Sequence, residues 1–236
     1  MNCQNGTVIV STVTLSPYLN YTQFLVWNDD DDEDDNNFCT TVPIFDLSPH
    51  LVAATAGNNI HGQVMKSKLH SCCQSLLKQQ QEHIQAGPLA RFVADQLQVP
   101  TQTVGGKSGD GLLQSFCLIV GNGELWRVDP TGQFWKCQAA VIGKSAIRAE
   151  EELYKQLQNT TDWSSLSTEE ALKLLLNCLE TTTTPKTPGQ SSLIQPSTKT
   201  FWQAVVLENS KSTTPQRRIR RGAFLPKKTK NSIVTQ

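Results

Sequence analysis

Apolar residues recur along this 236-residue chain with either the alternating period of a β-strand or the longer period of an α-helix. Each change of period marks where one element ends and the next begins. After Gly143, a helical period appears, with Ala146, Ala149, Leu153 and Leu157 at helical spacing. Just upstream, the segment WRVDPTGQFWKC alternates apolar and polar residues on both sides of Asp-Pro-Thr-Gly. The pattern predicts a β-hairpin that leads through a glycine into an amphipathic helix.

The same periods predict the remaining elements. Strands are expected at residues 7–14, 21–27, 50–56, 112–120 and 201–207, and further helices at 59–83, 88–97 and 167–180. Helices that come in pairs between runs of strands favour an α+β sandwich, in which the helices cover the outer faces of packed sheets.

The helix expected at 167–180 has two features of its own. Ser167 and Glu170 have the spacing of a capping box, which defines where the helix begins. Its apolar residues, from Ala171 to Leu179, occupy more than one side of the helix. This helix is therefore expected to be covered on two sides.

Charge is segregated along the chain, although the formal net charge is +0. Residues 29–35 are all acidic, and residues 217–230 hold seven basic residues and no acidic one. We expect the acidic block in a solvated loop and the basic segment in a disordered tail with nuclear-import activity. Because the two blocks cancel, the composition is not that of a nucleic-acid-binding protein, and direct RNA or DNA binding is not favoured.

The seven cysteines are odd in number and include no C-x-x-C pair. That usage is typical of reduced thiols in a cytoplasmic or nuclear protein. The N-terminal residues lack the basic start of a secretory signal, and no apolar run is long enough to span a membrane. The expected localisation is cytoplasmic and nuclear, with no membrane partner.

Other candidate chemistry is weak. His50, His61, His70 and His83 have neither i, i+4 pairing nor a neighbouring cysteine at ligand spacing, so no metal site is expected. The sequence GGKS at 105–108 lacks the first glycine of a phosphate loop, because Thr101 stands at that position. We interpret this segment as a flexible connection, and we expect no cofactor and no small-molecule ligand.

Four stretches resemble a known family. They are PIFDLSPHLVAATAG, PLARFVADQLQVPTQTVGG, GELWRVDPTGQFWKCQAAVIGKSAIRAEEEL and STEEALKLLLNCL, and together they span about residues 43–179. They are similar to proteasome subunits, and the Asp-Pro-x-Gly hairpin with its Ala-Val-Ile-Gly turn is similar to those of α-type subunits. The chain is thus identified as a divergent α-type member with an atypical N-terminal region.

The resemblance implies a four-layer αββα sandwich, with two antiparallel sheets flanked by helices, as in N-terminal nucleophile hydrolases. The implied organisation is divergent N-terminal strands with an acidic loop at 1–42, the αββα domain at 43–208 and a basic, disordered tail at 209–236. The helix that follows Gly143 is expected in an outer layer, against the sheet to which its own hairpin belongs.

The implied function is that of a non-catalytic α-type subunit of the proteasome core particle. Such a subunit is a structural ring component in ubiquitin-dependent protein degradation, and its partners are other α-type and β-type subunits. Proteolysis takes place on the β-type partners. A second interpretation is an orphan proteasome-like protein that binds proteasome subunits without joining the ring.

A third interpretation is a threonine hydrolase with Thr7 as its nucleophile, because cleavage after Gly6 would free an amine to act as the base. Active relatives carry a lysine at the start of the third strand, and Pro43 occupies that column here. Residues 7–27 contain no Asp, Glu, Lys or Arg. We therefore expect no catalytic residue, and Thr7 is the candidate only under this third interpretation.

Overall fold

The computed structural model of the protein describes ten segments of the chain. They are 1–3, 6–14, 44–80, 84–102, 113–121, 123–143, 146–158, 165–183, 200–208 and 216–224. The expected strand at 21–27, the acidic block at 29–35, Pro43, His83, and GGKS at 105–108 lie outside them.

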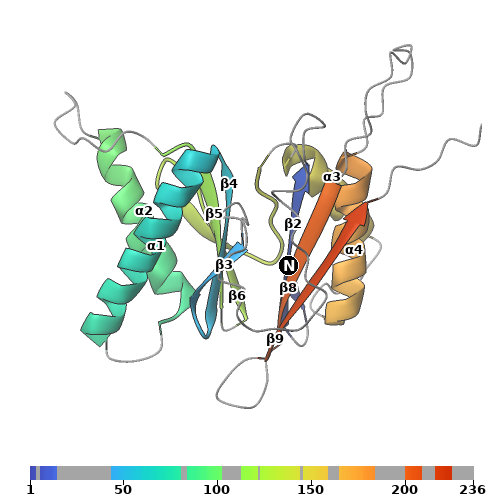
Figure 1. Cartoon of the computed structure of the whole chain (residues 1–236), viewed down its shortest axis with the longest axis horizontal. Helices are drawn as coiled ribbons and strands as arrows, with labels where there is room; N and C mark the ends of the chain where they lie inside the picture. The colour runs from blue at the N-terminus through green and yellow to red at the C-terminus, as the bar shows by residue number, and fades with distance from the viewer. Residues whose placement is uncertain are drawn as a thin grey trace, which may run out of the picture.

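Two antiparallel sheets and four helices make up the described fold (Figure 1). The first sheet has the order β3-β4-β5-β6-β7, formed by Ile44–Ser48, Leu51–Gly57, Ser115–Gly121, Glu124–Val128 and Phe134–Cys137. The second has the order β1-β2-β8-β9, formed by Asn2–Cys3, Gly6–Thr14, Thr200–Glu208 and Gln216–Phe224. The helices are α1 (Asn59–Gln80), α2 (Ala86–Gln102), α3 (Ala146–Gln158) and α4 (Thr168–Thr183).

The helices lie in two pairs on opposite sides of the sheets. Figure 1 shows α1 and α2 beside the five-stranded sheet, and α3 and α4 beside the four-stranded sheet. The prediction of an α+β fold is confirmed.

Three clusters of buried apolar residues hold these parts together. The first joins α1 and α2 to one face of the five-stranded sheet and includes Met65, Leu89 and Ile119. The second joins α3 and α4 to β2 through residues such as Leu153 and Val8. The third contains residues of both sheets, including Ile9 of β2 and Val120 of β5, so the facing sides of the two sheets are in contact.

Local sequence signals set several element ends. The Ser167 hydroxyl accepts the backbone N–H of Glu170 at 3.3 Å, and the Glu170 carboxylate accepts the N–H of Ser167 at 3.0 Å. The predicted capping box is therefore confirmed. At the β6–β7 turn, Gly132 has a φ of +84°, and an added Cβ would lie 2.7 Å from the carbonyl oxygen of Ala94 in α2. A side chain at this turn would therefore clash with α2.

The predicted location of α3 is wrong. Leu153 and Leu157 are buried as expected, but they pack with α4 and β2 rather than with the sheet of the preceding hairpin. The outer face of β6 and β7 already contacts α2. After β7 the chain therefore crosses to the other sheet, with Ala140 and Ile142 packed against the cluster between the sheets.

The prediction of a disordered tail over residues 209–236 is wrong for residues 216–224. These residues form β9, which pairs with β8 from Gln216↔Glu208 to Phe224↔Thr200. The sequence pattern missed this strand because QRRIRRGAF has no apolar alternation, and its pairing with β8 defines it as a strand. The strand at 200–208 is thus followed by another strand.

Candidate functional site

Thr7 lies in the middle of a sheet. It pairs with Asn2 of β1 on one side and with Leu207 of β8 on the other. Its side chain is buried, and the hydroxyl donates a 2.7 Å hydrogen bond to Asn2 Oδ1. Because alternate strand residues share a face, Thr7 is on the same side of β2 as Ile9, which packs between the two sheets.

Use of Thr7 as an N-terminal nucleophile would require a rearrangement of this strand. Nucleophilic threonine chemistry requires cleavage of the bond between Gly6 and Thr7, which would free the threonine amine. Gly6 pairs with both Cys3 and Glu208, so the bond lies in a strand that is paired on both sides. Cleavage would separate β1 from β2, and the Thr7 hydroxyl already bonds to a neutral amide oxygen, which is a poor proton acceptor.

The junction between β4 and α1 is the second candidate region. Gly57 ends β4 with a φ of +145°, and an added Cβ would lie 2.4 Å from the carbonyl oxygen of Gln114. Asn58 Oδ1 accepts the Ile60 N–H at 2.9 Å and so caps α1. His61 Nδ1 accepts the N–H of Gln114 at 3.0 Å. These bonds fix the start of α1 against the beginning of β5.

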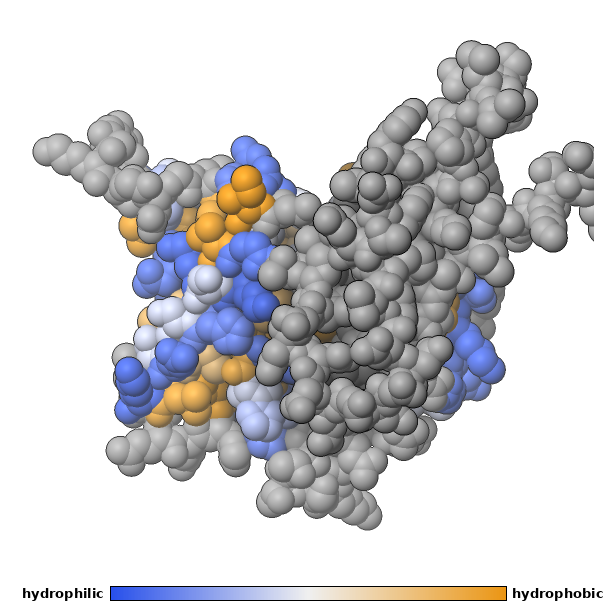
Figure 2. All heavy atoms as spheres, in the orientation of Figure 1, coloured by the Kyte–Doolittle hydropathy of each residue, from blue (hydrophilic) through white to orange (hydrophobic). Residues whose placement is uncertain are grey.

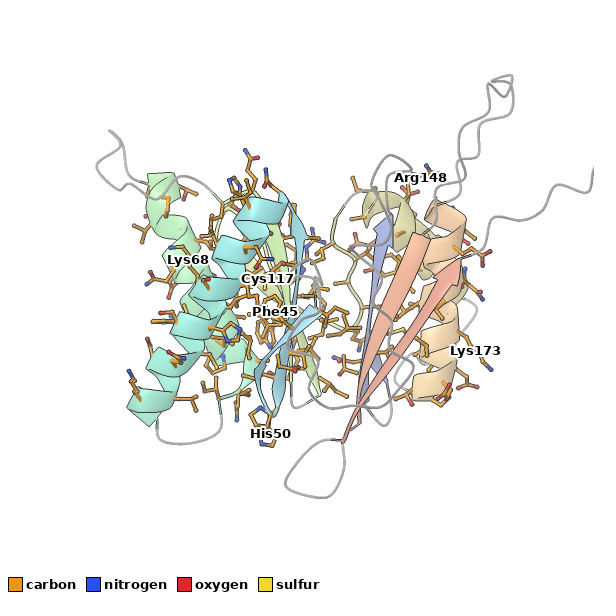
Figure 3. The ribbon with its side chains drawn as sticks, in the orientation of Figure 1. Phe45, His50, Lys68, Cys117, Arg148 and Lys173 are labelled. Atoms are coloured by element: carbon orange, nitrogen blue, oxygen red, sulfur yellow. The ribbon has the colours of Figure 1, made fainter. Side chains whose placement is uncertain are left out.

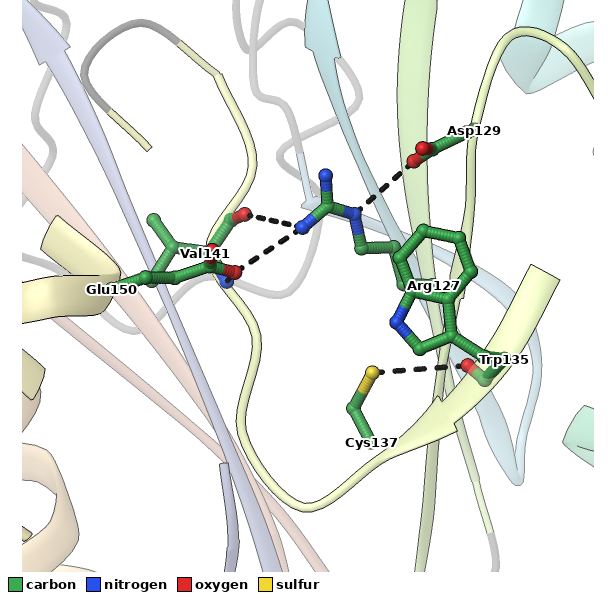
Figure 4. Close-up of polar contacts among 6 residues, drawn as sticks. All are labelled: Arg127, Asp129, Trp135, Cys137, Val141 and Glu150. Atoms are coloured by element: carbon green, nitrogen blue, oxygen red, sulfur yellow. Dashed lines mark hydrogen bonds and ion pairs between the residues drawn. The ribbon is translucent and has the colours of Figure 1, made fainter. Parts of the chain in front are cut away.

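A polar cluster surrounds Arg127 of β6 (Figure 4). Its Nε donates to Asp129 at 3.1 Å and its Nη1 donates to Glu150 of α3 at 3.2 Å. The guanidinium also lies over the rings of Trp135 and Phe116, at 5.1 and 5.5 Å from the ring centroids. The Arg127 guanidinium therefore contacts β5, the β6–β7 turn, β7 and α3.

This cluster holds the crossover between the two sheets. Glu150 Oε1 accepts the backbone N–H of Val141 at 3.2 Å, and Arg127 Nη1 donates to the Val141 carbonyl at 3.5 Å. Arginine stays protonated, so it supplies neither an acid nor a base. The arrangement can fix the chain between β7 and α3.

A family model for the proteasome subunit matches residues 40–191, which is more than half of the chain. The chain belongs to the proteasome subunit family. None of the curated proteins matches it. The match covers the five-stranded sheet and all four helices, whereas the strands of the other sheet lie outside it.

Membership of this family brings the α+β fold of N-terminal nucleophile hydrolases and a partnership with other proteasome subunits. In the part of the chain that the structure describes, none of the helices has the length and apolarity that crossing a membrane requires.

The histidines of this proteasome subunit are dispersed. The His70 ring lies 5.9 Å from that of Phe45, and burial followed by the nearby Lys66 lowers the pKa of His70. His50 lies at the β3–β4 turn, far from the start of α1 (Figure 3). Within the described segments, no three His, Cys, Asp or Glu residues are grouped to hold a metal ion.

The described cysteines have the properties of core thiols. Burial raises the pKa of Cys117, which is fully buried in β5, and that of Cys73 in α1. Cys178 of α4 has a pKa raised to about 11, by burial first and then by the nearby Glu152. Raised values keep the thiols protonated, and a protonated thiol is a weak nucleophile.

Several apolar side chains of this proteasome subunit are exposed on its helices. On α1, Ile60 is 73% and Val64 is 39% exposed, and the two are one turn apart. On α3, Ile147 is 75% exposed. Figure 2 shows apolar side chains at the surface over α1, among polar ones. The helices therefore offer apolar contact area on both sides of the molecule.

Sequence patterns did not indicate the Arg127 cluster. One signal was available, because Arg127 is a charged residue inside an apolar strand with aromatic neighbours. Its partner Glu150 is 23 positions later and on another element, and no local pattern connects the two.

Proposed function

We propose that this chain is a non-catalytic, α-type subunit of the proteasome core particle. Its role is structural: it joins a ring of related subunits, and peptide hydrolysis takes place on β-type partners in the cytoplasm and the nucleus. We further propose that its helix pairs and sheets form the four-layer αββα sandwich of the family.

The observation that carries this proposal is the position of Thr7. Its hydroxyl is buried and bonded to Asn2, and the Gly6–Thr7 bond lies in a doubly paired strand. The tight β6–β7 turn supports the α-type assignment. Here the Asp129 N–H donates to the Gln133 carbonyl at 2.8 Å, and the Gly132 N–H donates to the Asp129 carbonyl at 3.0 Å. The Asp-Pro-x-Gly sequence of this turn resembles that of α-type subunits.

A threonine-directed β-lactone probe tests the absence of catalysis. We expect no labelling of the purified chain, and the same background for a Thr7→Ala variant. A catalytic β-type subunit in the same assay is the positive control. Stoichiometric modification of Thr7, identified by mass spectrometry, would overturn the proposal and favour the threonine hydrolase.

Ring membership requires a docking face, and α1 and α2 supply the one we propose for contact with β-type subunits. Ile60 and Val64 of α1 provide exposed apolar area. A charge placed in an apolar contact must be desolvated without a partner, which weakens association.

Co-purification on native gels tests this face. We expect the tagged chain to migrate with α-type and β-type subunits, and Ile60→Glu to remove most of that association. Ile147→Glu on α3 is the matched control, because Ile147 is exposed to the same degree on the opposite side of the molecule. If the unmodified chain binds single subunits but never migrates with a ring, the orphan interpretation replaces this one.

A further inference from the structure

The four edge strands of the two sheets differ in how open they are to pairing. β1 has two residues and β7 has four, so each offers few free backbone groups. β3 has five residues and an irregular register between Asp46 and Ser48. β9 has nine residues in unbroken register with β8. Short edges and bulges prevent pairing with other chains, and β9 has neither.

The outer edge of β9 has no partner among the described residues. The sheet has the order β1-β2-β8-β9, and Figure 1 shows β9 beside β8 at the end of that sheet. In an antiparallel pair, alternate residues direct their N–H and C=O groups away from the neighbouring strand. A nine-residue edge therefore presents a regular row of donors and acceptors.

Charge determines which strand this edge can accept. β9 contains Arg217, Arg218, Arg220 and Arg221 within five positions. By register, position 217 lies on the same face of the sheet as Leu207, and position 218 lies on the opposite face. The arginines thus occupy register positions on both faces of one edge strand, and a second copy of β9 would bring like charges together.

We propose that β9 is a docking edge for an extended acidic segment of another protein, which adds to the four-stranded sheet as a fifth strand. Backbone hydrogen bonds along the edge provide affinity, and pairing of carboxylates with the arginines provides selectivity. This role is additional to ring membership and uses strands outside the residues that the family model matches.

Fluorescence anisotropy with a defined peptide tests the proposal on the full chain. The probe is labelled Thr-Val-Glu-Glu-Val-Glu-Glu-Val-Thr, whose glutamates match the spacing of the arginines in either strand direction. We expect saturable binding that weakens as salt is added, and no binding of the same peptide with Lys in place of Glu.

Two N-methylated peptides distinguish strand addition from simple charge attraction. One isomer is methylated at the even positions and the other at the odd positions, so each loses the N–H donors of one edge only. Strand addition predicts that one isomer binds like the parent peptide and that the other does not bind. Equal binding of the two isomers would overturn the proposal.

A pair of variants tests the location. Arg218→Gln with Arg220→Gln should weaken binding by about tenfold or more, because two charge-assisted contacts are lost. Arg148→Gln with Lys155→Gln on the exposed surface of α3 is the matched control and should bind like the unmodified chain. Both pairs are checked for folding by circular dichroism. Equal weakening by both pairs, or tighter binding of a single-stranded oligonucleotide that displaces the peptide, would also overturn the proposal.

Discussion

The two sheets of this molecule differ in how they relate to the family. The five-stranded sheet and the helices that cover it lie wholly within the matched residues 40–191. The four-stranded sheet is built from strands that precede and follow the matched residues, and only its covering helices belong to them. The first sheet therefore lies inside the matched region, and the strands of the second sheet lie outside it.

The two sheets also differ in how much the surrounding structure constrains their residues. The five-stranded sheet contacts helices on one face and the other sheet on its opposite face, and its turns include positive-φ glycines at positions 57 and 132. Such positions tolerate few substitutions. β9, at the edge of the other sheet, pairs with β8 on one side only.

The largest expected effect concerns the packing of α3 against α4 and the four-stranded sheet. Leu153→Ala should lower the free energy of unfolding by roughly 2–5 kcal/mol, because Leu153 is fully buried beneath α3. Ile147→Ala on the same helix is the control and should change it by less than about 0.5 kcal/mol, because Ile147 is 75% exposed. Chemical denaturation measures both.

A double-mutant cycle sharpens this test. Leu153→Ala should couple to Val8→Ala by about 0.5–3 kcal/mol, because the two residues share a cluster with β2. It should be additive with Phe134→Ala, because Phe134 packs against the cluster under α1 and α2. The reverse result would place α3 on the sheet of its own hairpin.

The next effect concerns the stability contributed by two glycines, Gly132 and Gly62, near the five-stranded sheet. Gly132→Ala should cost about 1–3 kcal/mol, because its φ of +84° is strained for alanine and the new Cβ would lie 2.7 Å from the Ala94 carbonyl. Gly62→Ala in α1 should instead stabilise by about 0.5–1 kcal/mol, because its Cβ has ordinary space at 3.4 Å from Thr55 Oγ1. Thermal unfolding that moves in the same direction for both variants would contradict this prediction.

A smaller effect is expected at the N-terminal caps of α1, beside the five-stranded sheet, and of α4, beside the four-stranded sheet. Asn58→Ala removes the cap of α1, and Ser167→Ala removes that of α4. Each should cost about 1 kcal/mol, because one backbone donor loses its partner. Similar losses in urea denaturation would show that a cap contributes the same stability to the helices beside either sheet. If only one substitution lowers the free energy of unfolding, tertiary contacts hold the start of the helix whose cap removal had no effect.

The smallest effect is a pH dependence of stability that appears only at alkaline pH. Burial raises the pKa of Cys178 from 9.0 to about 11, so the folded state holds its proton more tightly than the unfolded state. The contribution of this thiol is complete below pH 9 and is lost as the pH rises towards about 11. We expect stability to fall over that range, and to fall less in Cys178→Ala. An identical pH dependence in the variant would refute the assignment.

Local patterns predicted most of the fold. The alternation around Asp129 gave the hairpin, helical spacing gave α3, and Ser167 with Glu170 gave the start of α4. Two features could not be predicted. The contact of α3 with β2 depends on α2 occupying the hairpin's outer face, and β9 depends on pairing with β8. Both are consequences of tertiary arrangement, which periodicity does not encode.

The candidate site was predictable in part. The Gly-Thr dipeptide identified Thr7 as the residue to examine, but its burial and its bond to Asn2 depend on β1 pairing with β2. The Arg127 cluster depends on residues brought together from three elements. When contacting side chains come from different elements, no short spacing in the sequence indicates the contact.

The pairing of β2 with β8 also has a consequence during synthesis of the chain. Thr7 pairs with Leu207, two hundred positions later. At a translation rate of about 5–20 residues per second, β2 waits roughly 10–40 s for its partner. The five-stranded sheet is complete by Cys137, so it can fold earlier. Until then the apolar residues of β2 lack their final neighbours, and the nascent subunit should depend on chaperones over this interval.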